Sequence, residues 1–348
     1  MYKIIKNIRT VNNRGTMIQI DGSHGEGGGQ ILRTAVALSM VKGEKVRVNN
    51  IRANRPNPGL SHQHLMALKA AKDISDAEAE GLRKGSRKVT FEPDEIRRGL
   101  YKFDIGTAGS ITLLLQTVLP PALLSGEPVE IEVRGGTDVK WSPPYDYFEN
   151  VFLENLREMG AEIESELIKR GHYPKGGGKI KVSVEPSSLR DLEVSDKIEK
   201  IEGRAFVTNL PLHIARRMKK SALKELIEYD TSISVESYRS ASAGTAITLW
   251  TRGGRIVGRG ILGEKGVPAE KIGSDAAEGL MKDIRDSVDV DVWCADQLVP
   301  YLGLIDQNGV LNTEEKTGHL ETNLWVVNQF MDDKMKLEEH EGYISIKY

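Results

Sequence analysis

Apolar residues in the first half of the chain change repeatedly between the alternating spacing of a strand and the three-to-four spacing of a helix. Apolar and polar positions alternate around Ile18 and Ile20, whereas apolar residues recur at helical spacing from Ile31 to Leu38. The same pattern predicts strands at 17–22, 46–51, 89–92, 129–133, 161–167 and 178–184, and helices at 31–38, 61–72, 106–124 and 145–159. Strands and helices that alternate along a chain indicate an α/β (α+β) fold.

A faint internal repeat supports this class of fold. Residues 26–33 and 106–113 each place a glycine-rich turn directly before an apolar helix. Duplication of an α/β unit explains the pair, and independent convergence of two helix starts is the alternative. The sequence therefore predicts a main domain built of repeated βα units.

The pattern changes after about Pro186. Strands are predicted at 201–207, 232–238, 246–251 and 255–262 with one helix at 214–227, followed by helices at 269–284 and 295–302 and strands at 288–293 and 343–346. One helix among strands predicts a compact α/β insert. We therefore expect a main domain of residues 17–186 and 278–348 and a smaller inserted domain of residues 187–277. Residues 1–16 are expected to be a poorly ordered extension, or to lie upstream of the true start.

Composition narrows the class of protein. The 348 residues carry a net charge of −2 and are 39% hydrophobic, as in a soluble globular protein. No apolar run approaches the roughly 20 residues that cross a membrane, and we expect no secretion signal. The single cysteine, Cys294, excludes an intramolecular disulfide framework and a thiolate zinc cluster. We expect a cytoplasmic protein without membrane contact, and the sequence leaves open whether it forms a homo-oligomer.

One local stretch is basic although the whole chain is not. No acidic residue lies between Lys45 and Lys72, while Arg52, Arg55 and His64 lie on both sides of a rigid Pro-Asn-Pro-Gly turn. A protein that coats nucleic acid needs a strong positive balance, so any contact with a polyanion must be local here. We expect this stretch to bind phosphate, and a solvated surface is the alternative.

A glycine-rich turn carries a second candidate site. Glu26 lies in a run of glycines before a predicted helix, and Arg33 lies on that helix. Backbone amides of such turns bind phosphate, but this turn lacks the spacing of a P-loop or of a dinucleotide fingerprint. A carboxylate and a guanidinium beside one turn suit a metal–phosphate site, with Glu26 for the cation and Arg33 for phosphate oxygens. An ordinary salt bridge is the alternative.

His319 is the candidate nucleophile. It follows Gly318 at the start of a predicted apolar helix, where backbone N–H groups converge. Such a terminus attracts phosphate and disfavours imidazolium, and a neutral imidazole beside a phosphate can attack a nucleotide. A structural histidine at a helix end is the alternative, and His319 alone does not decide between the two.

Several motifs together resemble the RNA 3'-terminal phosphate cyclases. They cover the chain from about Met17 to its end, in the order of the family, and the combination is very specific. The motifs are Glu26-Gly-Gly-Gly-Gln-Ile-Leu-Arg33, Asn50-Ile-Arg-Ala-Asn-Arg-Pro-Asn-Pro-Gly-Leu60 with Gln63-His64, Gly135-Gly-Thr-Asp-Val139 with Pro143-Pro144, Ala295-Asp296-Gln297-Leu298, and Gly318-His319-Leu320 with Thr322-Asn323.

The resemblance implies a fold and a reaction. Each repeated unit would resemble the C-terminal domain of bacterial translation initiation factor three, with a smaller domain inserted before the last unit. A histidine would attack the α-phosphorus of ATP, giving a histidine–AMP phosphoramidate and pyrophosphate. AMP would pass to the RNA 3'-phosphate, and the neighbouring 2'-hydroxyl would displace AMP to close a 2',3'-cyclic phosphate. ATP, RNA with a 3'-terminal phosphate, and Mg²⁺ or Mn²⁺ are thereby implied.

The resemblance also implies residue roles. His319 matches the nucleophile, and Glu26 matches a position near the divalent metal. Gln116 matches an adenine contact, and the nucleotide-binding segment matches Trp293, Cys294, Ala295, Asp296 and Gln297, although the family often has Tyr or His in place of Trp293. The phosphate-side cluster, which would hold the RNA end, matches Arg33, Arg52, Arg55, Gln63 and His64. Because these residues all lie outside 187–277, we expect the insert to be dispensable for the AMP adduct.

Two other functions fit parts of the sequence. A non-catalytic relative of the cyclases that assists ribosome assembly would keep the fold and lack the nucleophile. His319 and the set around Glu26 and Arg33 argue against it. An enolpyruvyl transferase on repeated α/β units would bind a small phosphorylated substrate, but it would not need His319, and no motif of that class is apparent.

Overall fold

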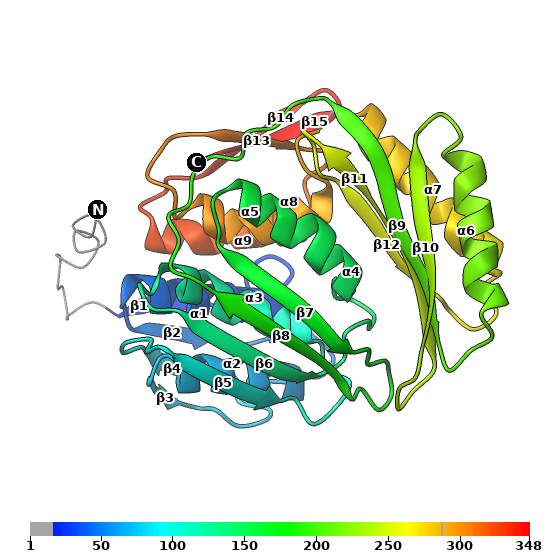
Figure 1. The fold of residues 1–348 in the computed structure, drawn as a ribbon. Helices are drawn as coiled ribbons and strands as arrows, with labels where there is room; N and C mark the ends of the chain where they lie inside the picture. The colour runs from blue at the N-terminus through cyan, green and yellow to red at the C-terminus, as the bar shows by residue number, and fades with distance from the viewer. Residues whose placement is uncertain (1–16, 287) are drawn as a thin grey trace.

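The computed structural model describes residues 17–286 and 288–348 (Figure 1). The extension predicted for residues 1–16 lies outside them. Four sheets with helices packed against them make up the described chain, which confirms the predicted α/β class. Within these two ranges, no helix is both long and apolar enough to cross a membrane.

The N-terminal unit contains the first sheet. Its elements are β1 (Ile18–Asp21), α1 (Gly29–Lys42), β2 (Val46–Asn49), α2 (His62–Ile74), β3 (Glu78–Glu80) and β4 (Val89–Glu92). The strand order is β1-β2-β4-β3, with β1 and β2 parallel and the other pairs antiparallel. Helix α1 is therefore the crossover between the two parallel strands, and it is buried along most of its length.

The second unit repeats this arrangement. It consists of β5 (Gly99–Asp104), α3 (Ile111–Leu124), β6 (Val129–Gly135), the continuous helix α4 (Tyr145–Tyr147), η1 (Phe148–Leu153) and α5 (Glu154–Glu158), then β7 (Ile163–Lys169) and β8 (Gly178–Val184). The strand order is β5-β6-β8-β7, and again only the first pair, β5 and β6, is parallel. Two units with one strand order agree with the internal repeat that the glycine-rich turns predicted.

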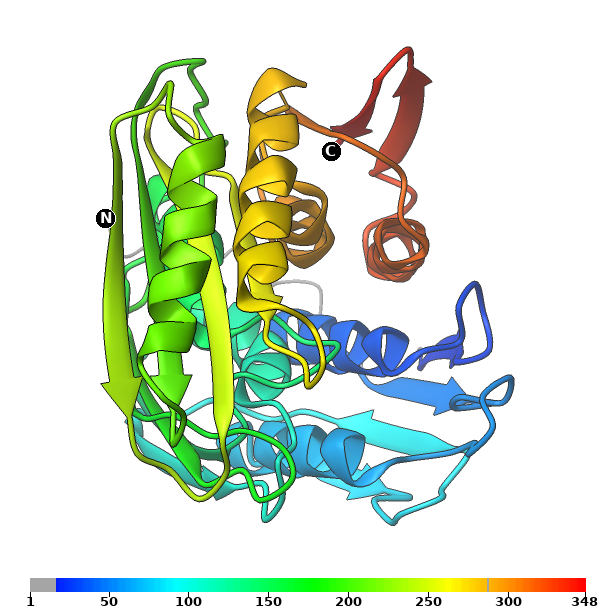
Figure 2. The same cartoon turned by 90° about the vertical axis from the view of Figure 1, so that its right-hand side faces the viewer.

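The insert has a sheet and an apolar cluster of its own. Its elements are β9 (Ile198–Thr208), α6 (His213–Glu225), β10 (Thr231–Tyr238), β11 (Gly244–Gly253), β12 (Gly258–Leu262) and α7 (Ala269–Arg285), with the strand order β10-β9-β11-β12. The cluster extends from Ile201 to Ile284. The predicted limit at residue 277 therefore cuts through α7, and the exact limits of the insert stay a prediction. Figure 2 shows the insert along one side of the molecule.

The C-terminal part contains α8 (Val292–Leu302), β13 (Val310–Thr313), α9 (Gly318–Phe330), β14 (Lys336–His340) and β15 (Tyr343–Lys347). The strand predicted at 288–293 is wrong. The Asp291 carboxylate accepts hydrogen bonds from the backbone N–H groups of Trp293 and Cys294, each at 3.1 Å, and so caps α8. The residues before Asp291 still touch the sheet, because the N–H of Asp289 donates to the carbonyl of Asn312 at 3.0 Å.

A buried ionic network joins the insert to the second unit. The fully buried guanidinium of Arg170 donates to Asp138 at 3.1 Å and to Asp146 at 2.7 Å. From the insert, Arg204 donates to Asp146 at 2.5 Å, and the ring of Phe206 lies 3.6 Å from the Arg170 guanidinium carbon. The charges are matched inside the protein, so the contact between the two parts is specific rather than a loose apolar one.

Candidate functional site

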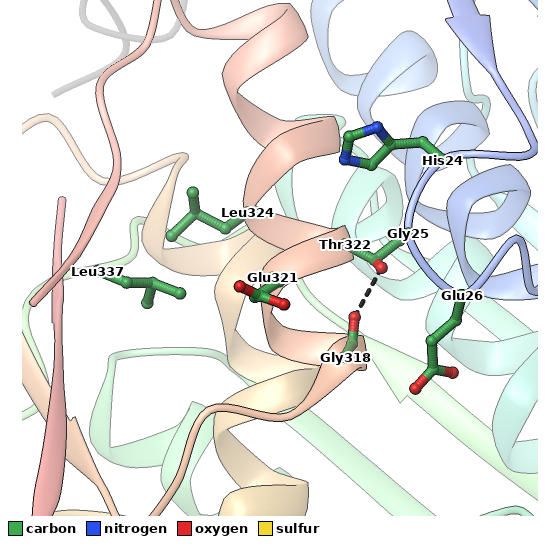
Figure 3. A pocket seen from close by; sticks show the side chains of 8 residues that line it. All are labelled: His24, Gly25, Glu26, Gly318, Glu321, Thr322, Leu324 and Leu337. Carbon is green, nitrogen blue, oxygen red and sulfur yellow. Dashed lines mark hydrogen bonds between the residues drawn. The ribbon is translucent and has the colours of Figure 1, made fainter. Parts of the chain in front are cut away.

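The two motifs at opposite ends of the chain meet at the start of α9. Nδ1 of His319 lies 3.3 Å from Oε2 of Glu26, which belongs to the glycine-rich turn before α1. A Cβ at position 318 would lie 2.4 Å from the Glu26 carboxylate, so any residue other than glycine would displace this side chain. Figure 3 shows Glu26 beside Gly318. The fold thus brings together the metal candidate and the nucleophile candidate.

The start of α9 is fixed by a chain of side-chain hydrogen bonds. Oγ1 of Thr317 accepts from the N–H of Leu320 at 2.9 Å and donates to Asp296 at 2.5 Å. Nδ2 of Asn323 donates to the Asp296 carbonyl at 2.6 Å, and Thr34 on α1 donates to Asn323 at 2.7 Å. The backbone that carries His319 is therefore tied to both α8 and α1.

His319 is held as a neutral imidazole. Its side chain is 51% exposed, so it can meet a ligand. Partial burial of the ring lowers the pKa of His319, and the cations Arg33 and Arg55 add to this, while the Glu26 carboxylate opposes it. A neutral ring keeps one nitrogen lone pair free, as a nucleophile requires.

Arg33 is a buried cation without a counter-ion among the described residues. It is 9% exposed, and its Nε has no hydrogen-bond partner. Burial lowers the pKa of Arg33 to about 10. A buried guanidinium needs an anion to offset the cost of its desolvation, and within 17–286 and 288–348 no carboxylate supplies it. The arrangement is that of an anion site.

His64 lies near this cation, and Arg55 lies beside Glu26. Burial, followed by Arg33 and Arg52, lowers the pKa of His64 to about 3, so the ring is neutral. Nδ1 of His64 accepts from the backbone N–H of Ser61, which leaves the proton on Nε2, the atom that faces Gly29. Nη2 of Arg55 lies 3.6 Å from Glu26. His64 and Arg55 thus lie beside the glycine-rich turn, and phosphate binding by the basic stretch stays a prediction.

Two other members of the predicted phosphate cluster are engaged within the protein. Nη1 of Arg52 donates to the carbonyls of Asn57 and Gly59 at 2.7 and 3.1 Å, which holds its own loop closed. Gln63 points the other way, because its Nε2 donates to the carbonyl of Ser110 at 2.9 Å. Both bonds position loops that border the site.

The predicted nucleotide-binding segment lies along the first turns of α8. Gln116 on α3 donates to Gln297 at 2.9 Å, and Gln297 donates to the carbonyl of Trp293 at 2.8 Å. Trp293 is 42% exposed. Cys294 and Ala295 face the core instead; the Cys294 sulfur accepts from Asn155 at 3.4 Å, and burial raises the pKa of this thiol. Their side chains are thus placed for packing.

Asp296 connects α8, which carries the predicted nucleotide-binding segment, to the start of α9, which carries His319. Burial, together with the nearby carboxylates of Asp291 and Glu26, raises the pKa of Asp296 to about 7, while the hydrogen bond from Thr317 opposes the rise. The motifs in the sequence include Asp296 but neither Thr317 nor Thr34. A single hydroxyl that caps a helix, or that bonds an amide far along the chain, has no distinctive spacing.

A pocket of about 500 Å³ is lined in part by Glu26 (Figure 3). Its lining includes His24, Glu321, Leu324 and Leu337 as well as Glu26 and Gly318. The ring of His24 stacks on Trp325 with 3.9 Å between centroids. No motif in the sequence marks this pocket, because its walls come from a turn, a helix and a strand that are far apart in the chain.

A metal site made only of protein ligands is absent from the described part of the chain, where no group of three or more His, Cys, Asp or Glu side chains could hold an ion. Glu26 offers a single, partly exposed carboxylate. One carboxylate suits Mg²⁺ that is bound largely by substrate phosphates and water, and it does not suit a dedicated cage.

Comparison with known proteins agrees with the motifs. Residues 24–337 match the family model of RNA 3'-terminal phosphate cyclase. The chain is 44% identical to the RNA 3'-terminal phosphate cyclase of Methanosarcina barkeri over 95% of this chain and 99% of the relative. It is 46% identical to the protein of that name from Methanopyrus kandleri over 94% and 97%, and 46% identical to that from Pyrococcus furiosus over 90% and 93%.

Proposed function

Because the chain belongs to the RNA 3'-terminal phosphate cyclase family, we propose that it uses ATP to convert an RNA 3'-terminal phosphate into a 2',3'-cyclic phosphodiester. The observation that carries the proposal is that a neutral, partly exposed His319 lies within electrostatic reach of the buried cation Arg33, whose charge no carboxylate among the described residues balances. A nucleophile beside an anion-binding site is what nucleotidyl transfer requires.

The first step is attack by His319. Nδ1 faces the Glu26 carboxylate at 3.3 Å, so a proton on Nδ1 leaves the lone pair on Nε2. Nε2 forms the bond to the α-phosphorus of ATP, and the bond from that phosphorus to the pyrophosphate oxygen breaks. The product is a histidine–AMP phosphoramidate. Glu26 stabilises the positive charge that develops on the ring.

The later steps transfer AMP and close the ring. An oxygen of the RNA 3'-phosphate attacks the AMP phosphorus, and the bond to Nε2 breaks. The neighbouring 2'-hydroxyl then attacks the 3'-phosphorus, loses its proton, and displaces AMP. Arg33 and Arg55 offset the charge on the phosphates, with the N–H of His64 as a further donor. Arg52 and Gln63 contribute by holding the loops at the border of the site.

The residues at the nucleotide side suit a base. We assign Gln116 and Gln297 to the adenine, since amide groups match a purine edge, and Trp293 to one wall against the ring. Cys294 and Ala295 support this wall from the core. Asp296 fixes the start of α9 through Thr317.

Glu26 would hold a Mg²⁺ or Mn²⁺ ion together with phosphate oxygens, and such an ion would neutralise negative charge on the triphosphate. The cytoplasmic location and the homo-oligomer stay predictions.

The test is the ATP-dependent conversion of an RNA that carries a labelled 3'-phosphate. We expect the label to become resistant to phosphatase with ATP and Mg²⁺, and to stay sensitive without ATP. His319→Ala should abolish the conversion while the protein stays folded. A wild-type protein that binds such RNA but never converts it would favour the non-catalytic alternative.

A further inference from the structure

Arg259 is a residue of the insert that reaches the nucleotide side of the site. Its guanidinium carbon lies 4.3 Å from the centre of the Trp293 ring. Gly258 precedes Arg259 in β12, and its N–H donates at 3.0 Å to the carboxylate of Asp291, the residue that caps α8. On the other side of Arg259, a Cβ at Gly260 would lie 2.8 Å from Cγ of Pro144. Three consecutive residues of the insert thus lie against the main domain, at α8 and at the start of α4.

The side chain of Arg259 is fixed from several directions. Its Nε donates to Asp283 at 2.6 Å, and its Nη2 completes a bidentate pair with the same carboxylate. Nη2 also donates to Glu314 at 3.3 Å. The Asp283 side chain is fully buried and that of Glu314 nearly so. A Cβ at Gly279 would lie 3.2 Å from the Arg259 stem, so α7 confines the chain as well. The guanidinium therefore has one well-defined position.

These contacts connect two parts of the site that are separate in the sequence. Trp293 stands on α8, whereas Glu314 follows β13 in the segment that leads to Thr317 and His319. Arg259 touches both. The edge of the Trp293 ring also meets Tyr147, with 6.3 Å between centroids. The cation lies over the indole ring, and the 42% of Trp293 that stays exposed can meet a flat ligand.

We propose that Arg259 is a positioning residue that holds Trp293 as a wall for the base of ATP, so that the insert forms part of the nucleotide site. This inference rests on the proposed function, because the base is that of its nucleotide. It also departs from the expectation that the insert is dispensable for the AMP adduct. That expectation considered only motif positions, and none of the motifs contains Arg259.

The experiment measures the Kd for ATP by titration calorimetry with Mg²⁺ present. The full chain carries His319→Ala, which stops the chemistry. Arg259→Met should raise the Kd about three- to thirtyfold, the range expected when a cation leaves a partly exposed aromatic ring. Arg259→Lys keeps a charge near Asp283 but loses the planar stacking. Its Kd should therefore lie between the value with Arg259 and the value with Arg259→Met. The matched control is Arg217→Met, which removes another bidentate pair of the insert, that with Glu270. Its Kd should not change.

A double-mutant cycle separates positioning from general destabilisation. If Arg259 acts through Trp293, Arg259→Met should change the Kd less than twofold once Trp293→Ala is present. An unchanged Kd in Arg259→Met, or the same fold-change with and without Trp293, would overturn the proposal. The proposed function fails separately, if the chain with His319 intact binds ATP and forms no adduct.

Discussion

Arg33 gives the sharpest prediction, because its buried charge should lower the stability of the protein without ligand and yet help to bind an anion. One substitution should therefore raise the stability and slow the reaction. Burial lowers its pKa from 12.5 to about 10, which corresponds to roughly 3 kcal/mol for keeping the charge in this surrounding. Arg33→Met keeps an apolar stem of similar length and removes that cost. We therefore expect the free energy of unfolding without ligand to rise by about 1–3 kcal/mol.

The same substitution should damage the reaction. An anion bound by Arg33 would lose a charge-assisted pair of about 1.5–3 kcal/mol. Adduct formation at low ATP should then slow by about tenfold to a hundredfold. Stability is measured by urea unfolding, and the adduct by label transferred from ATP to protein.

Arg170 provides the matched control. It is buried even more completely than Arg33, but two carboxylates pair with it. Arg170→Met would leave the Asp138 carboxylate without its cation and Asp146 with Arg204 alone, and it should destabilise the protein by about 3–5 kcal/mol. If Arg33→Met destabilised the protein in the same way, or formed the adduct at the wild-type rate, the interpretation of Arg33 as an anion site would be wrong.

Three further predictions follow from individual contacts. The pKa of His319 lies below 6.5, so adduct formation should persist as the pH falls through 6.5 and decline only at lower pH, where the ring gains a proton; a pH–rate profile with its midpoint above 6.5 would contradict this. Gly318→Ala should slow the adduct by more than about tenfold with the fold kept, because its Cβ would displace the Glu26 carboxylate; a wild-type rate would show that this carboxylate is not needed in place. Arg52→Ala should lower the melting temperature by several degrees, because it loses the two bonds that close its loop, whereas Arg55→Ala should leave stability unchanged and weaken the binding of 3'-phosphorylated RNA; the reverse result would exchange their roles.

Local signals in the sequence located most of the fold and part of the site. Glycines and capping residues mark where α1, α2 and α9 begin, since their backbone requirements are local. Strand β5 gave too weak a signal, because none of its residues is fully buried. The strand predicted at 288–293 was wrong for a different reason. Its alternation was that of a strand, but the Asp291 carboxylate bonds the N–H groups of the next turn and starts a helix there.

Partners across long sequence distances could not be predicted. The pairing of Asp296 with Thr317 and the stacking of Arg259 on Trp293 depend on how separate elements pack. The motifs did identify the charged residues that meet, such as Glu26 and His319. They did not distinguish Arg33, which lacks a partner among the described residues, from Arg52, which bonds its own loop.

The central claim is that His319 carries the AMP. The direct measurement is to incubate the protein with α-labelled ATP and Mg²⁺ without RNA, digest it, and identify the labelled peptide by mass spectrometry. We expect one adduct on His319, labile to acid and stable to alkali as a phosphoramidate is, and no label on His319→Ala. Label on His64, or a labelled His319→Ala protein, would contradict the account.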